Sequence, residues 1–95
     1  MKTYLVTITA DTSCPGYNKV LNIKVMRAAT RAGLRESKEL IDLAETRPIK
    51  ILLRADQLGM LVAETKYIEC EPSQGLRILS VEAFDRIFYD FSTNN

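Results

Sequence analysis

Two short helices separated by a glycine form the pattern that most constrains this chain. Residues Lys19 to Asp42 read KVLNIKVMRAATRAGLRESKELID. Asn18 can cap a first helix, which we expect over 19–31, and the second should run from Leu34 to Glu45. Gly33 lies between them, where we expect the left-handed backbone that ends the first helix. Each helix has one apolar stripe, so the pair must pack against a further layer to fold.

The flanking segments supply that layer. Tyr4, Val6 and Ile8 alternate with other residues in a segment rich in β-branched and aromatic residues, which predicts a strand. The element order should be strand, helix, helix, strand, helix, strand. We therefore predict an α+β fold of two layers, a small and mainly antiparallel sheet with helices on one face. The other expected elements are a strand at 47–54, a helix at 56–65, a strand at 66–71 and a short strand at 76–79.

A last helix is predicted after Ser80, as part of a C-terminal extension over 73–95. Its apolar residues recur at helical spacing. They either complete the core or form a patch through which Phe84, Phe88 and Phe91 associate with a second copy or a partner. The residues of this stripe are Val81, Phe84, Ile87, Phe88 and Phe91.

Composition excludes several classes of function. Ninety-five residues with 46% hydrophobic and 26% charged content predict one domain over 1–95. The absence of histidine removes every catalytic arrangement that uses an imidazole base, and two distant cysteines cannot form a four-ligand zinc site. We expect no enzyme, cofactor or metal. No apolar run is long enough to span a bilayer, so we expect a cytoplasmic protein.

The helix pair resembles the C-terminal domain of the bacterial ribosomal stalk protein, most clearly over 19–48. That family has lysine, valine, two apolar residues, isoleucine, lysine, two apolar residues and arginine in its first helix, and this chain has KVLNIKVMR from Lys19 to Arg27. Gly33, Leu34, Glu36 and Lys38 follow at the family spacing, with the family-like part taken as 1–72. Two departures are Arg31 at a family glycine and Asn22 at an apolar position. If Asn22 is buried, it needs hydrogen-bond partners.

The resemblance implies a non-catalytic module that recruits translation factors, used here alone as an accessory or a mimic. By helical periodicity, Val20, Ile23, Lys24 and Arg27 share one face of the first helix. Apolar residues ringed by basic ones favour docking of an acidic protein. The predicted partner-binding residues are Lys19, Val20, Ile23, Lys24, Arg27, Gly33, Leu34 and Lys38.

Other interpretations of the same helices stay open. The residues from Lys19 to Lys38 include six basic side chains and one acidic one, Glu36, which also fits a helix-turn-helix that binds nucleic acid. Near-neutral total charge and the acids Glu39 and Asp42 argue against it. A third alternative is an adaptor for a protease chaperone, since such adaptors share the stalk-domain fold. The acidic amine-binding pocket of those adaptors has no signature here.

The role of the C-terminal apolar stripe can be tested by substitution. We expect Phe84→Asp combined with Phe88→Asp to unfold the protein, because charges in a core position cost several kcal/mol. Gel filtration with circular dichroism measures the outcome. A folded monomer obtained from a dimeric wild type would instead show that the stripe is an association surface.

Overall fold

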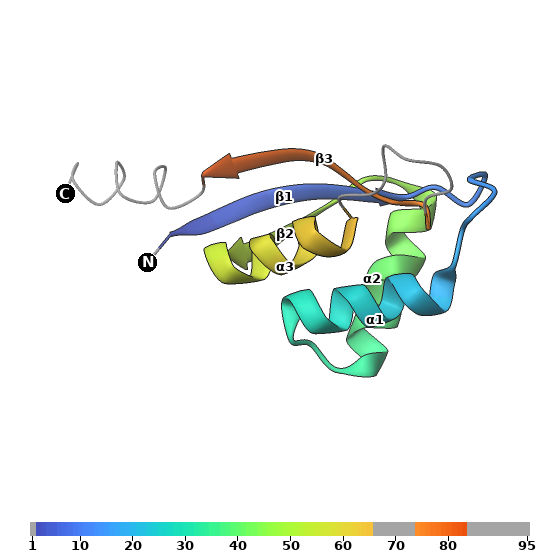
Figure 1. Cartoon of the computed structure of the whole chain (residues 1–95), viewed down its shortest axis with the longest axis horizontal. Coiled ribbons are helices and arrows are strands. Elements are labelled where there is room, and N and C mark those ends of the chain that lie inside the picture. The colour runs from blue at the N-terminus through green and yellow to red at the C-terminus, as the bar shows by residue number, and fades with distance from the viewer. Residues whose placement is uncertain (1, 66–73, 84–95) are drawn as a thin grey trace.

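The computed structural model describes residues 2–65 and 74–83, which form three helices and three strands (Figure 1). The order from the first strand to the third helix is the predicted one, and the last described strand is longer than the short one predicted at 76–79. The strands are β1 (Thr3–Ala10), β2 (Ile49–Arg54) and β3 (Leu76–Ala83). The helices are α1 (Lys19–Thr30), α2 (Leu34–Thr46) and α3 (Ala55–Thr65).

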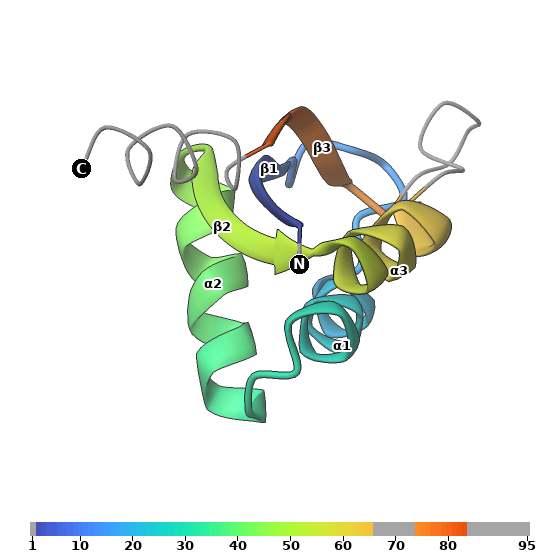
Figure 2. The ribbon, with the colours of Figure 1, turned by 90° about the vertical axis from the view of Figure 1, so that its left-hand side faces the viewer.

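The strands form one antiparallel sheet in the order β2-β1-β3. All three helices lie on the same side of this sheet, so the fold has two layers (Figure 2). α1 packs against both α2 and α3, and α2 crosses α1 steeply, as the two views in Figures 1 and 2 show. The predicted α+β class and the helices on one face are confirmed.

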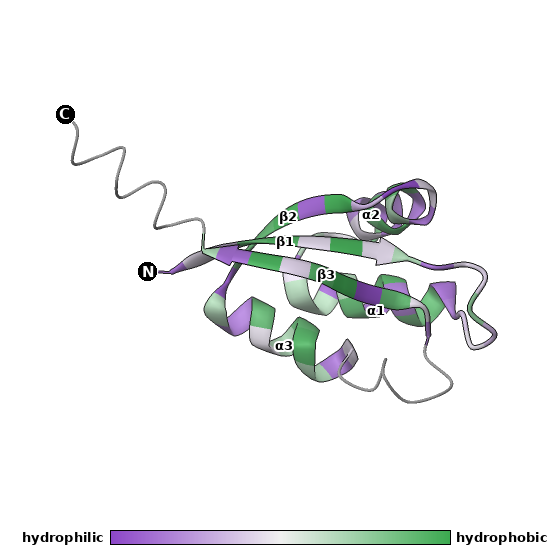
Figure 3. Ribbon diagram, turned by 90° about the horizontal axis from the view of Figure 1, so that it is seen from above, coloured by the Kyte–Doolittle hydropathy of each residue, from purple (hydrophilic) through white to green (hydrophobic). Residues whose placement is uncertain are grey.

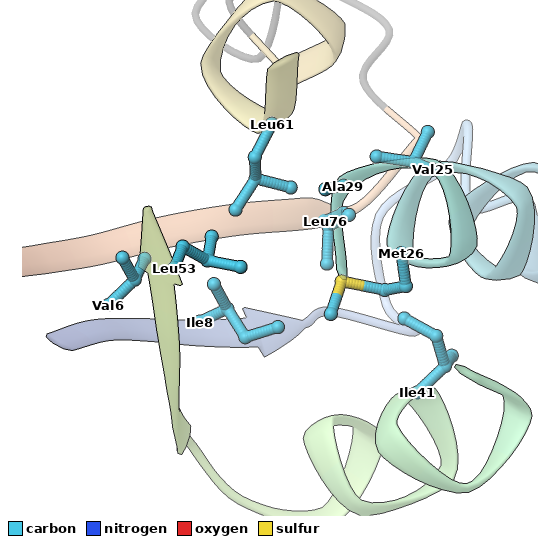
Figure 4. Packing of buried hydrophobic residues seen from close by; sticks show 9 residues of the cluster. All are labelled: Val6, Ile8, Val25, Met26, Ala29, Ile41, Leu53, Leu61 and Leu76. Carbon is cyan, nitrogen blue, oxygen red and sulfur yellow. The ribbon is translucent and has the colours of Figure 1, made fainter. Parts of the chain in front are cut away.

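Alternation along the strands decides which residues enter the core. On β1, Val6, Ile8 and Ala10 are buried, while the residues between them are only partly covered. The register places Ile51 opposite Val6, so the two strands present their apolar residues to the same layer of helices. Figure 3 shows this change of hydropathy from residue to residue. The central cluster in Figure 4 joins the sheet to all three helices through Val6, Ile8, Val25, Met26, Ala29, Ile41, Leu53, Leu61 and Leu76.

α1 turns a different face inward from the one that hydrophobicity suggests. Leu21 and Ala28 fit an inward stripe by sequence, yet both are exposed, and the buried stripe contains Asn22 instead. The Asn22 amide is accommodated because its Nδ2 donates to the backbone carbonyl of Gln74 at 3.0 Å. This hydrogen bond offsets part of the cost of burying the amide, whereas Asn22 Oδ1 is buried with no hydrogen-bond partner among the described residues.

The turn between α1 and α2 corrects the prediction for Gly33. The left-handed residue is Arg31, with φ 62°, and its N–H donates to the Arg27 carbonyl. Gly33 is extended, with φ −69°, and caps the start of α2, where its carbonyl accepts from the Ser37 N–H. The prediction failed because glycine was assigned the left-handed position by its preference alone. A non-glycine residue there carries a cost of about 1 kcal/mol.

The predicted start of the C-terminal helix is wrong. Ser80 and Val81 belong to β3, which continues to Ala83 and pairs with β1 along its length. Hydrogen bonding to β1 overrides the helical periodicity at these positions. The register shifts by one residue between Thr7 and Ile8, leaving Leu79 as the extra residue of a bulge. The strand expected at 66–71 and the stripe from Phe84 to Phe91 lie outside the described residues.

Replacing glycine with alanine should change the stability of the fold in opposite directions at Gly59 and Gly75. Gly59 lies inside α3, and a Cβ there would meet nothing within 4 Å, so Gly59→Ala should stabilise the fold by about 0.5–1 kcal/mol. Gly75 has φ +94°, and its Cβ would come within 2.8 Å of the Asp11 carbonyl oxygen. Gly75→Ala should therefore destabilise by about 1–3 kcal/mol. Urea denaturation of both variants measures these changes, and a gain at Gly75 would contradict the close approach.

Candidate functional site

Most of the predicted partner-binding residues of α1 point away from the core, whereas Lys19 faces α2 and Ile23 packs partly against the core. The buried residues of this helix are Asn22, Val25, Met26 and Ala29. Val20, Ile23, Lys24 and Arg27 each precede one of them by two positions, which is about 200° around an α-helix. The core of the protein therefore turns this basic and apolar face away from the sheet.

Two large apolar side chains, one on α1 and one on α2, are highly exposed to solvent. Val20 is 64% exposed and Leu34, at the start of α2, is 59% exposed. Within residues 2–65 and 74–83, these are the two most exposed large hydrophobic side chains. Ile23 differs from them, because it is half-buried and packs against the core cluster. Ile23 therefore contributes to folding as well as to this surface.

The four basic residues predicted for the site fall into two groups. Lys24 and Arg27 are exposed, and neither forms a salt bridge with the described residues. Lys19 and Lys38 both contact Asp42, the first through Nζ to Oδ1 at 2.6 Å and the second through Nζ to Oδ2 at 2.9 Å. Of these four residues, only Lys24 and Arg27 therefore have no salt bridge to an acidic group within the described part of the chain.

The position of Lys19 explains its pairing. It lies one residue before Val20, about 100° around α1, on the flank that faces α2. Its Nζ also lies 3.2 Å from Glu45 Oε1. The hydrogen bond to Asp42, followed by the one to Glu45, raises the pKa of Lys19. Hydrogen bonds from Lys19 and then Lys38 lower the pKa of Asp42. Lys19 and Asp42 thus both stay ionised, and so paired with each other, in neutral solution.

Tyr17 adds the loop before α1 to this network. Its hydroxyl donates to Glu45 Oε2. Burial, and then this hydrogen bond to a carboxylate, raise the pKa of Tyr17 to about 12. The neutral phenol can donate to Glu45, whereas a phenolate beside that carboxylate would repel it. The network therefore ties three segments of the chain together, namely the loop, α1 and α2.

Sequence reasoning missed the acidic half of this network. The predicted site contained Lys19 and Lys38 but neither Asp42 nor Glu45. The spacing of four between Lys38 and Asp42 was a usable signal, since residues four apart on a helix are neighbours. The pairing of Lys19 with both acids depends on how α2 crosses α1, and no local pattern indicates it. Gly33 belongs to the turn beside Leu34, with no described contact to the charged network.

The described residues supply no sign of a metal centre or a membrane span. Within residues 2–65 and 74–83, no three His, Cys, Asp or Glu side chains are grouped so as to hold a metal ion. No helix in the same ranges is long and apolar enough to cross a membrane. Comparison with known proteins finds no family model that matches the chain, and no curated protein or solved structure that is significantly similar. Function must therefore be argued from the residues themselves.

The Tyr17 contact predicts a loss of stability at high pH. A tyrosine whose pKa is about 10 unfolded and about 12 folded stabilises the native state below pH 10. That contribution is lost as pH rises through 12. Because Tyr17 is partly exposed, the decrease in the free energy of unfolding should be only about 1–2 kcal/mol. Urea denaturation at pH 9 and pH 11.5 should show a smaller decrease for Tyr17→Phe than for the wild type, and equal decreases would disprove the contribution of Tyr17.

Proposed function

We propose that this protein is a non-catalytic, cytoplasmic module that binds an acidic protein partner through α1 and the start of α2. The docking surface consists of Val20, Ile23, Lys24, Arg27 and Leu34. By the resemblance of residues 19–48 to the ribosomal stalk domain, the partner is a translation factor. In this proposal the protein acts on its own, as an accessory to the ribosomal stalk or a mimic of it.

This proposal rests on one observation. Exposed apolar side chains occur together with basic side chains that form no salt bridge within the described residues. Val20 and Leu34 are the most exposed large hydrophobic residues of the described chain. Lys24 and Arg27 share the outer face of α1 with Val20. Apolar contacts supply most of the affinity of a protein interface, while charges at its rim steer the partner and fix its orientation. The outer face of α1 thus combines both requirements, through Val20 on the one hand and Lys24 and Arg27 on the other.

The pattern of charge favours an acidic partner. Lys24 and Arg27 are three residues apart, so their side chains project from neighbouring turns, about 4.5 Å apart along the helix axis. A partner that presents carboxylates at a similar separation can meet both groups. An arginine can also bind a carboxylate through two parallel hydrogen bonds. The salt dependence of binding should therefore reflect these two residues.

Nucleic acid is a less well supported partner. In a helix-turn-helix protein α2 would enter the groove of DNA, but this helix carries four acidic residues and two basic ones. Glu36 and Glu39 are both exposed and would face the phosphates. Self-association through Phe84, Phe88 and Phe91 remains a separate proposal that rests on the sequence.

Charge reversal on α1 tests the docking surface. We expect Lys24→Glu with Arg27→Glu to weaken binding to elongation factor G by roughly 1–3 kcal/mol or more, because both rim charges then repel an acidic partner. Both residues are exposed, so the free energy of unfolding should change by less than about 0.5 kcal/mol. Isothermal titration calorimetry and urea denaturation measure the two quantities. Val20→Ser should also weaken binding, through the loss of apolar contact.

A matched control separates specific docking from total charge. Lys2→Glu with Lys50→Glu makes the same change in net charge at two exposed positions outside the helices, one just before β1 and one on β2. This control should bind nearly as well as the wild type in moderate salt, where distant charges are screened. Equal losses for the two double variants would mean that net charge, and not this surface, governs binding. Absence of binding by the wild type would overturn the translation-factor proposal.

A further inference from the structure

Asp42 lies between the two helices of the docking surface and contacts a lysine on each. One carboxylate oxygen is 2.6 Å from Lys19 Nζ on α1, and the other is 2.9 Å from Lys38 Nζ on α2. Lys38 is a neighbour of Leu34 on α2, one helical turn further along. Asp42 therefore pairs with two lysines that neighbour residues of the docking surface, Lys19 beside Val20 and Lys38 one turn from Leu34.

We propose that Asp42 acts as an internal competitor of the acidic partner, holding Lys38 in the free protein and so setting the strength and charge selectivity of docking. This inference rests on the proposed function. A partner carboxylate near Leu34 must either displace Asp42 from Lys38 or bind without that lysine. A weakly acidic partner meets only Lys24 and Arg27, whereas a strongly acidic one can also draw Lys38 away. Asp42 thus determines specificity without attracting the acidic partner itself, because it controls whether Lys38 can bind that partner.

The two lysines held by Asp42 differ in how readily they can be released. Lys38 is 59% exposed, and within the described chain its only salt bridge is to Asp42. Lys19 is 38% exposed and also contacts Glu45, which is in turn hydrogen-bonded by Tyr17. If Asp42 is neutralised, Lys19 keeps a carboxylate partner and Lys38 does not. The effect on a partner should therefore pass through Lys38.

Neutralising Asp42 provides the test. We expect Asp42→Asn to raise the association rate with elongation factor G by about two- to fivefold at low salt, since attraction at the rim of an interface acts mainly on that rate. The gain should shrink as salt is added. Replacing Lys38 as well, in Asp42→Asn with Lys38→Gln, should abolish the gain, whereas Lys19→Gln in the same background should leave most of it. Stopped-flow or surface plasmon resonance at several salt concentrations gives these rates.

A control of equal charge separates this effect from a general rise in net charge. Glu82→Gln removes one negative charge from an exposed residue on β3 that has no salt bridge within the described chain. A gain for Asp42→Asn well above that of Glu82→Gln, and dependent on Lys38, supports the inference. Equal gains, no gain, or a slower association for Asp42→Asn overturn it while leaving the docking surface in place. If the wild type does not bind at all, the proposed function and this inference fail together.

Discussion

The backbone carbonyl of Gln74 is the point on which the arrangement of this fold depends. It accepts from the Asn18 N–H at 3.2 Å and from Asn22 Nδ2 at 3.0 Å, while the neighbouring Gly75 carbonyl accepts from the Asp11 N–H at 2.8 Å. The end of β1, the start of α1 and the start of β3 thus meet in a few hydrogen bonds between residues far apart in sequence. Because Asn22 is fully buried there, these bonds fix the rotation of α1 about its axis, and that rotation turns Val20, Lys24 and Arg27 outward.

A second polar network continues from the first. Tyr17 is the residue before Asn18, and its hydroxyl links the loop that precedes α1 to Glu45 on α2. Lys19 then joins α1 to the same helix. The interactions that link the two helices therefore also pair the positive charges of Lys19 and Lys38 with carboxylates. Single substitutions of Lys19 or Lys38 would therefore affect the contacts between segments of the fold as well as any docking, and they are informative only in the Asp42→Asn background. Lys24 and Arg27 are better probes of docking.

The sequence was enough to predict the fold class, the order of elements from the first strand to the third helix, and the alternation along β1, because period-two alternation is a local signal. It also placed Val20, Lys24 and Arg27 on one helix face, which follows from periodicity alone. It failed where a distant group decides the outcome. Asn22 enters the core because of Gln74, 52 residues further along the chain, and Arg31 takes the left-handed position that was expected of Gly33. Ser80 and Val81 join β3 because β1 offers them hydrogen bonds, although their spacing also fits a helix. The ties of Lys19 to Asp42 and Glu45 depend on the crossing of α1 and α2 and have no local signature.

The bulge at Leu79 has a consequence for the behaviour of the protein at high concentration. In the described sheet β3 is an edge strand, and a regular edge is a template on which strands of other molecules can stack and seed aggregates. An extra residue breaks the even spacing of the backbone donors and acceptors and increases the local twist. A second molecule could then match only a short part of this edge before losing register. The bulge interrupts the hydrogen-bond ladder between β1 and β3 within one molecule. In return, it reduces the tendency of many molecules to join into fibrils.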